Sequence, residues 1–180
     1  MATIVGLEVE GGAVLAGDRR TTDGGTVRSE DKRHVFDFGD AGAAAVGESG
    51  GVDAFSRRLE SEVRDHETRH GEPMSLTRLA NVASDIASEG GVEAIVAARE
   101  DDVPRIRGVG TDGSVLTDAT AAFGSGSQLA LGALEGADRN QSLDAGEDLA
   151  RDAIGAATDR DVATGEDADT YRLGTDSDRL

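Results

Sequence analysis

The 180-residue chain contains no cysteine, no tryptophan and a single lysine, Lys32. The absence of cysteine excludes disulfide bonds and thiolate metal sites. No apolar run approaches the roughly 18 residues that a membrane-spanning helix requires, and the first residues lack the basic stretch of a secretory signal. These absences favour a cytoplasmic protein, and nothing in the sequence indicates a metal or another cofactor.

Basic residues are scarce relative to acidic ones. The chain has 36 aspartate and glutamate residues against 18 lysine and arginine residues, which gives a formal net charge of −18. Such an excess is typical of halophilic proteins, because salt at about 1 M screens charge repulsion beyond roughly 3 Å. The same charge repels phosphate and argues against a nucleic-acid partner. The apolar residues are periodic, which disfavours a disordered acidic chain.

The first part of the chain has the apolar alternation of short strands. Thr3 to Glu10 predicts one strand, and Ala13 to Ala16 predicts its antiparallel partner after a Gly11-Gly12 turn. Residues 18–25 are polar and glycine-rich, which indicates a loop. Further short strands are predicted at 26–29, 34–38 and 41–46.

The apolar period then changes to that of helices. Four apolar residues share one face of a first helix that ends near Gly71: Val52, Phe55, Leu59 and Val63. Ser75 is the expected N-cap of a second helix, which Gly90-Gly91 ends. The core-facing residues predicted for this helix are Leu76, Leu79, Ala83 and Ile86.

The second half of the chain repeats this order. Strands are predicted at 92–98, 105–109 and 114–117, followed by a short helix after Gly124–Ser127, a helix from a Ser142 cap to Arg160, and a weak strand at 170–173. Strands, two helices, strands, two helices and a strand predict an α+β protein with two packed antiparallel sheets and a helix pair outside each. We expect one domain over residues 1–173 and a flexible acidic tail over 174–180.

Five motifs occur in the order found in one known family: Thr3-Ile4-Val5-Gly6, Val14 to Arg20, Arg69 to Ser75, Phe123 to Ser127 and Arg160 to Gly165. They make the chain resemble proteasome β-type subunits, archaeal ones above all, over nearly its whole length. The resemblance implies the four-layer αββα sandwich of N-terminal nucleophile hydrolases and assembly into rings. The peptidase of the related bacterial two-component protease matches less well after the first motif, and the lack of a long leader argues against an α-type subunit.

In that family the mature chain begins with a threonine whose hydroxyl attacks the peptide carbonyl, and the free α-amine acts as base. The resemblance places Ala2 where that threonine stands and His34 where the family has a lysine. The other matched positions are the first aspartate, Asp18, the oxyanion glycine, Gly47, and the groups around the terminal amine, Ser125, Asp161 and Thr164. The resemblance therefore implies a site that keeps its surroundings but lacks the hydroxyl and the lysine.

These replacements lead to the hypothesis of a proteasome-like subunit that forms rings, with itself or with other subunits, and does not cleave by the usual route. Because methionine before a small residue is normally removed, we expect the mature chain to begin at Ala2. The alternative is an active threonine-type endopeptidase that cleaves unfolded proteins, either after trimming exposes Thr3 or through another nucleophile. Candidates for that nucleophile, with His34 as base, are Thr21, Thr22 and Ser49. A deliberate change of the nucleophile to alanine is disfavoured, because it would have left the lysine in place.

Some of these residues also have purely structural explanations. Asp18 followed by two arginines is compatible with a salt-bridged turn, and His34 with an ordinary strand residue. His66 and His70 have the i, i+4 spacing of a helical metal site, but no third ligand is near in the sequence and we expect them to face solvent. Gly124–Ser127 lacks the lysine of a P-loop, so phosphate binding is not expected. A monomeric ligand-binding domain is the third class of function left open.

Overall fold

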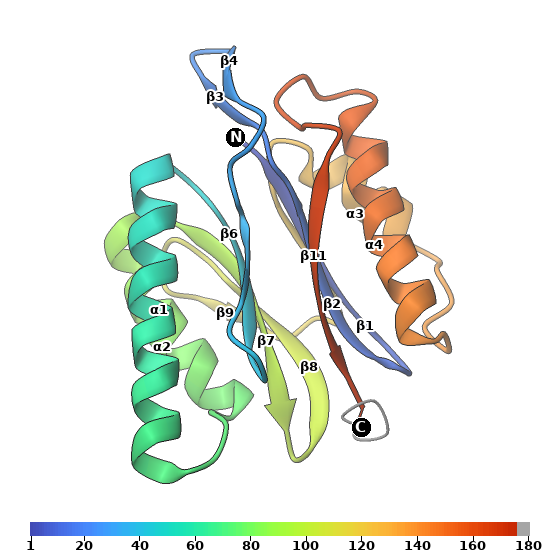
Figure 1. Cartoon of the computed structure of the whole chain (residues 1–180). Coiled ribbons are helices and arrows are strands. Elements are labelled where there is room, and N and C mark those ends of the chain that lie inside the picture. Colours follow the sequence, from blue (N-terminus) through green and yellow to red (C-terminus); the bar gives the residue numbers. More distant parts are fainter. Residues whose placement is uncertain (176–180) are drawn as a thin grey trace.

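The computed structural model of the chain describes residues 1–175, without the side chain of Ser49. Two β-sheets pack face to face, and a pair of helices covers the outer face of each (Figure 1). A separate hairpin, β3 (Thr21–Asp23) and β4 (Thr26–Ser29), projects near the N-terminus. The arrangement confirms the predicted α+β fold, a four-layer αββα sandwich. Residues 176–180 of the predicted acidic tail lie outside the described residues.

Both sheets are antiparallel. The first has the strand order β10-β1-β2-β11 and the second the order β5-β6-β7-β8-β9. The strands of the first sheet are β1 (Thr3–Val9), β2 (Gly12–Asp18), β10 (Thr120–Gly124) and β11 (Ala168–Gly174). Those of the second sheet are β5 (Val35–Asp37), β6 (Gly42–Val46), β7 (Glu93–Glu100), β8 (Val103–Val109) and β9 (Val115–Leu116).

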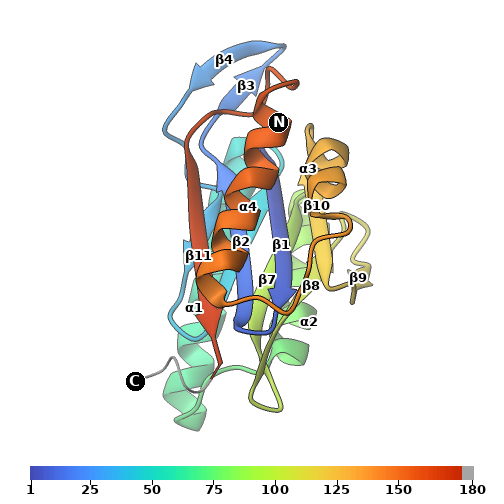
Figure 2. The same cartoon turned by 90° about the vertical axis from the view of Figure 1, so that its right-hand side faces the viewer.

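The helices lie where the sequence pattern predicts them. α1 (Ser49–His70) and α2 (Leu76–Gly90) cover the second sheet. α3 (Ser127–Leu134) and α4 (Leu143–Thr158) cover the first sheet, as Figure 2 shows from their side. The expected caps are confirmed, because Ser75 accepts a hydrogen bond from the main-chain N–H of Arg78 and Ser142 accepts one from Ala145.

Close approach of the two sheets depends on small residues. A Cβ atom at Gly6 of β1 would lie 2.8 Å from a methyl carbon of Ile95 in the facing sheet, too close for any other residue without a shift. Ile4 and Leu15 from the first sheet pack here against Ile95 and Ile106 from the second. The layer between the sheets is therefore close-packed, and the start of β1 lies within it.

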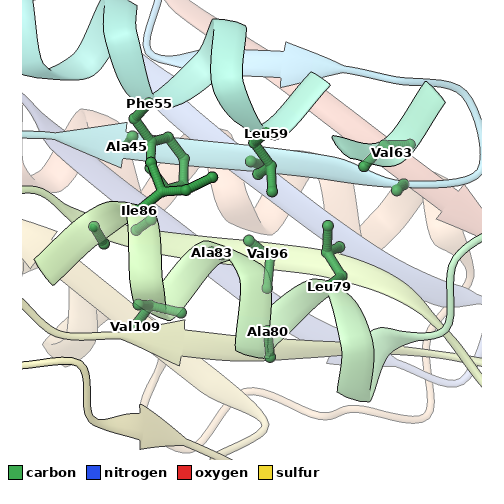
Figure 3. Close-up of a cluster of buried hydrophobic side chains, with 14 of the residues drawn as sticks. Ala45, Phe55, Leu59, Val63, Leu79, Ala80, Ala83, Ile86, Val96 and Val109 are labelled. Carbon is green, nitrogen blue, oxygen red and sulfur yellow. The ribbon is translucent and has the colours of Figure 1, made fainter. Parts of the chain in front are cut away.

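The helix pair α1 and α2 buries the apolar faces that the sequence predicts. Phe55, Leu59 and Val63 of α1 point toward the strands, and Leu79 and Ile86 of α2 point into the same cluster (Figure 3). Gly91 ends α2 in the left-handed conformation, with φ of 63°, as glycine does after a helix C-terminus.

Four strand predictions need correction. Residues 21–23, inside the predicted loop 18–25, form the strand β3. The turn between β1 and β2 is Glu10-Gly11 rather than Gly11-Gly12, because Gly12 already pairs with Val9. β10 was missed, since its short alanine-containing sequence lacks strand alternation. β8 begins at Val103, two residues earlier than predicted, after a two-residue turn in which Asp101 and Asp102 have φ of 50° and 65°.

The closing strand β11 is longer than the predicted residues 170–173, and it pairs with β2 over its full length. Tyr171 and Leu173 bury their side chains between the sheets. The polar residues that make the strand weak in sequence face α4, where Glu147 accepts hydrogen bonds from Thr170 and Arg172. Ion pairs with a helix thus supplement apolar burial in this strand.

We expect Leu59→Ala to lower the free energy of unfolding by about 3 kcal/mol, because it empties space under α1 where Leu59 is fully buried. Urea unfolding in molar salt measures the change. Arg57→Ala, at an exposed position of the same helix, should stay within about 0.5 kcal/mol of the unaltered protein. If the two changes lowered the free energy of unfolding equally, the burial of Leu59 in this cluster would not stabilise the fold as argued.

Candidate functional site

A cleft of about 180 Å³ lies at the end of the sandwich where the chain begins. It is bounded by the start of β1, by the segment before β5, by the segment after β6, and by the start of the β3–β4 hairpin. The residues that line it are Met1, Ala2, Arg20, Thr21, Thr22, His34, Gly47 and Glu48. Three of the positions matched by the resemblance, Ala2, His34 and Gly47, therefore meet in one place.

Ala2 and Thr3 point to opposite faces of the first sheet, because side chains alternate along a strand. Ala2 is 3% exposed and belongs to the cluster between the sheets, together with Ile4. Val5 and Leu7 belong to the cluster under α3 and α4, on the side to which Thr3 also turns. The methyl group of Ala2 borders the cleft, and the hydroxyl of Thr3 does not.

The hydroxyl of Thr3 belongs to a chain of hydrogen bonds that ends on Asp161. Its oxygen accepts from the main-chain N–H of Gly126 at 2.9 Å and lies 2.9 Å from Oγ1 of Thr164. Thr164 donates to Asp161 Oδ2 at 2.6 Å, so the Thr3 hydroxyl must donate to Thr164. Ser125 donates to the same carboxylate oxygen at 2.5 Å and also contacts the carbonyl oxygen of Met1. Ser125, Asp161 and Thr164 thus form one cluster, and it includes Thr3.

The charge of Asp161 is stabilised by this cluster. Burial opposes its ionisation, but the hydrogen bonds from Ser125 and Thr164 outweigh it and lower the pKa of Asp161 below the ordinary 3.8. The Met1 ammonium group contributes in the same direction. A carboxylate therefore stands next to the amino-terminal segment.

Asp18, at the end of β2, is fully buried and bonded to main-chain groups. Its Oδ1 accepts from Thr3 N at 2.7 Å, and its Oδ2 accepts from Gly165 N at 2.7 Å and Arg20 N at 3.0 Å. Burial raises the pKa of Asp18 above the ordinary 3.8, while these three donors act against the rise. The predicted salt-bridged turn is absent from the described residues, since the arginines that follow bind other carboxylates, Asp169 and Asp31 for Arg19 and Glu30 for Arg20.

His34 is 4% exposed and lies before β5. Its Nδ1 is 2.8 Å from the main-chain oxygen of Asp18, not from the carboxylate. Burial lowers the pKa of His34 below 6.5, and the hydrogen bond to Asp18 only partly offsets this. Lys32 does not take over as a cation in the cleft, because its ammonium group pairs with Asp53 of α1.

Glycines allow the main chain to approach the amino-terminal segment. A Cβ atom at Gly124, where φ is 104°, would lie 1.9 Å from the carbonyl oxygen of Ala2. A Cβ atom at Gly126 would lie 2.8 Å from Thr3 Oγ1. The glycine-serine turn therefore serves the start of β1, and no phosphate-binding role is needed to explain it.

Arg20 and Thr22 make contacts that the sequence did not predict, since Thr22 was considered only as an alternative nucleophile and Arg20 only as part of a turn after Asp18. The Arg20 guanidinium donates to the carbonyl oxygens of Val162 and Thr164 and fastens that loop to the start of the β3–β4 hairpin. Thr22 accepts a hydrogen bond from the Met1 ammonium group at 3.0 Å. The signal available for Arg20 was its position two residues after Asp18. Nothing in the sequence marks the contact of Thr22 with the amino terminus.

Metal chemistry has no support in the part of the chain that the structure describes. Within residues 1–175, no group of three or more histidine, cysteine, aspartate or glutamate side chains is arranged to hold a metal ion. The rings of His66 and His70 lie 4.5 Å apart between centroids, without a third ligand. His70 is exposed as expected, whereas His66 is half-buried.

No helix in the described chain combines the length and the apolar character that crossing a bilayer requires.

Comparison with known proteins decides the family. The sequence model described as "Proteasome subunit" matches residues 1–173. The chain belongs to the proteasome subunit family. It is 35% identical over 171 residues to a proteasome subunit beta of Halorhabdus utahensis, covering 91% of this chain and 72% of the relative. It is 34% identical over 169 residues to proteasome subunit beta 2 of Haloarcula marismortui, with 91% and 74% covered. A proteasome subunit beta of Haloquadratum walsbyi is 33% identical over 168 residues, with 91% and 69% covered. The predicted resemblance to halophilic archaeal β-type subunits is confirmed.

In this proteasome-family chain, we expect Asp18→Asn to lower the free energy of unfolding by about 3 kcal/mol. The amide keeps one accepting oxygen but turns an NH₂ group toward N–H donors, so charge-assisted hydrogen bonds are lost. Urea unfolding measures the loss, with Asp65→Asn at an exposed position of α1 as the matched control. A change at Asp18 no larger than the change at Asp65 would show that the main-chain hydrogen bonds to Asp18 do not stabilise the fold.

The lowered pKa of His34 predicts a pH dependence of stability. The unfolded chain protonates this ring at about 6.5, and the folded chain only at a lower pH. Between the two values the unfolded state holds more protons, so stability falls as the pH drops through this window and is fully present above it. Unfolding free energies measured across the window should show a component that His34→Gln removes and His70→Gln leaves. An unchanged slope in His34→Gln would be the contrary result.

Proposed function

We propose that the chain is a proteasome β-type subunit that takes part in assembly without cleaving peptides by the amino-terminal threonine route. The supporting observation is the methyl group of Ala2 at the cleft, beside the imidazole of His34 and beside Gly47. A hydroxyl nucleophile activated by a neighbouring base is the central requirement of that chemistry. Loss of an essential nucleophile lowers the rate by several orders of magnitude.

Trimming to Thr3 is a poor route to activity in this fold. The Thr3 hydroxyl lies on the helix side of the sheet, where Gly126 and Thr164 occupy it. The Thr3 main-chain nitrogen donates to Asp18, inside the fold. If trimming made Thr3 the amino terminus, its side chain would therefore have to turn to the opposite face of the first sheet before its hydroxyl could reach the cleft.

A second candidate is a peptidase with another nucleophile, which cleaves unfolded proteins. Thr21 and Thr22 favour it, because both line the cleft that contains His34. Thr22 is bonded to the Met1 ammonium group, so its hydroxyl would become available once Met1 is removed. The side chain of Ser49, the third candidate, lies outside the described structure.

The proposal includes assembly into rings, with identical chains or with active β-type subunits, in a salt-rich cytoplasm. The relatives are named as subunits, and the charge of −18 suits molar salt. Light scattering in molar salt tests this part, and a monomer would favour the simple ligand-binding domain instead.

Fluorogenic peptides test the catalytic part. We expect the unaltered protein to show no turnover that a threonine-directed inhibitor abolishes, because residue 2 supplies no hydroxyl. The double variant Ala2→Thr, His34→Lys is the matched positive control and should gain such turnover, with the inhibitor attached to residue 2. Inhibitor-sensitive turnover of the unaltered protein that Thr3→Val removes would overturn the proposal, and turnover lost in Thr22→Val would favour the second candidate. Amino-terminal sequencing should find Ala2 first.

A further inference from the structure

Nε2 of His34 is a polar atom for which the fold provides no partner. It makes no hydrogen bond with any residue from 1 to 175, whereas Nδ1 of the same ring is bonded to the Asp18 carbonyl. Two side-chain nitrogens in the described chain are buried without a partner, on His66 and Arg99, and Nε2 of His34 is not one of them. Nε2 therefore reaches solvent. Because His34 is otherwise buried and lines the cleft, it does so there.

The Asp18 carbonyl determines which ring nitrogen carries the proton. A carbonyl oxygen only accepts hydrogen bonds, so Nδ1 must donate. A neutral imidazole carries one proton, and with that proton on Nδ1 the other nitrogen has a free lone pair. Burial favours the neutral ring by lowering its pKa. The cleft thus holds a hydrogen-bond acceptor at the position where the family resemblance places an ammonium donor.

We propose that His34 Nε2 makes this cleft a binding site for a peptide side chain that is uncharged and donates a hydrogen bond, as a carboxamide or a hydroxyl does. This inference rests on the proposed function, because it assigns a ligand to a site that binds without cutting. His34 is then the residue that determines specificity. Its lone pair accepts from such a donor and repels a carboxylate, which has no proton to give.

The size and the charges of the cleft also favour a single uncharged side chain as the ligand. Its volume of about 180 Å³ equals roughly six water molecules of about 30 Å³ each, which suits one side chain. Positive charge comes from Arg20 and from the amino-terminal ammonium group, which Met1 carries in the structure and Ala2 carries after removal of Met1, and negative charge comes from Glu48. Glu48 forms no ion pair with any described residue. The cleft therefore carries charges of both signs, and an uncharged donor is repelled by neither.

Protonation of the ring removes the acceptor, so binding weakens at low pH. The charged groups that act on the ring from neighbouring elements are Asp18 of β2, Lys32 before β5 and Asp169 of β11. Each is already engaged, by main-chain N–H groups, by Asp53 and by Arg19 respectively. Those facing it from the walls of the cleft are Arg20, Glu48 and the Met1 ammonium. No described residue accepts a hydrogen bond from Nε2, so nothing in the fold holds a proton there.

Blocked tripeptides of alanine, a variable residue and alanine test the proposal on the full chain in molar salt. The variable residue is glutamine, methionine of similar shape, or glutamate. We expect the glutamine peptide to bind about tenfold more tightly than the methionine peptide, from one buried hydrogen bond. Its affinity should fall about tenfold per pH unit below the pKa of the ring. Nitrogen NMR of the imidazole should show a bare Nε2 above pH about 6.5 that shifts on addition of the glutamine peptide.

Variants at His34 separate recognition from folding. His34→Lys replaces the acceptor with a cation and should reverse the preference toward the glutamate peptide, while His70→Gln should leave all three affinities unchanged. A proton on Nε2 at neutral pH would overturn the proposal, and so would an unchanged preference in His34→Lys. Failure of all three peptides to bind at about 10 mM would also overturn it.

The two proposals fail in different ways. Mass spectrometry of the peptides after binding shows whether they stay intact. Cleavage that a threonine-directed inhibitor stops would refute the proposed function, whatever His34 does. Intact peptides whose binding does not depend on His34 would refute only the acceptor site.

Discussion

One buried carboxylate joins the separate pieces from which the cleft is built. Asp18 takes main-chain hydrogen bonds from the first strand, from the entry to the β3–β4 hairpin and from the loop after α4, at Thr3, Arg20 and Gly165. Both of its oxygens are engaged in this way, so its side chain does not reach the ring of His34. Charge-assisted bonds to three segments provide more geometric order than one salt bridge would, because each fixes main chain directly. The positions of Ala2, His34 and the loop at Thr164 follow from that junction.

Ala2 and Thr3 are consecutive residues whose side chains point to opposite faces of the first sheet. The strand alternation gives Ala2 to the cleft and Thr3 to the layer below α4, where its hydroxyl links Gly126 to Thr164 and Asp161. The Thr3 hydroxyl therefore lies on the opposite side of the first sheet from the cleft that Ala2 borders. The segment around Ala2 is closely surrounded, and a glycine at position 124 lets the main chain pass near the Ala2 carbonyl. These hydrogen bonds stabilise the fold whether or not catalysis occurs, which accounts for a well-formed site around a methyl group.

Sequence patterns predict the helices and most of the strands, but they miss β3 and β10. The faces of α1 and α2 and the Ser75 and Ser142 caps follow from period and local hydrogen bonding. β10 and the turn at Glu10-Gly11 do not, because alanine and glycine carry little pattern and the register is set by tertiary pairing. The site residues were gathered by family resemblance, and their grouping in space agrees with it. The bond of His34 to a carbonyl instead of a carboxylate, the place of Thr3 in the Asp161 cluster and the role of Thr22 depend on contacts between distant segments, which no local pattern records.

The hydrogen bonds of Asp18 also bear on how the chain folds. Gly165 is 147 residues away from it in sequence, and β11 completes the first sheet by pairing with β2 across a similar separation. Contacts between such distant segments close large loops and form late, after local helices and hairpins. A chain in which this corner is formed has therefore brought together residues 3, 18, 20 and 165, which are spread over most of its length. Truncation before Gly165 would leave one oxygen of Asp18 without that main-chain donor.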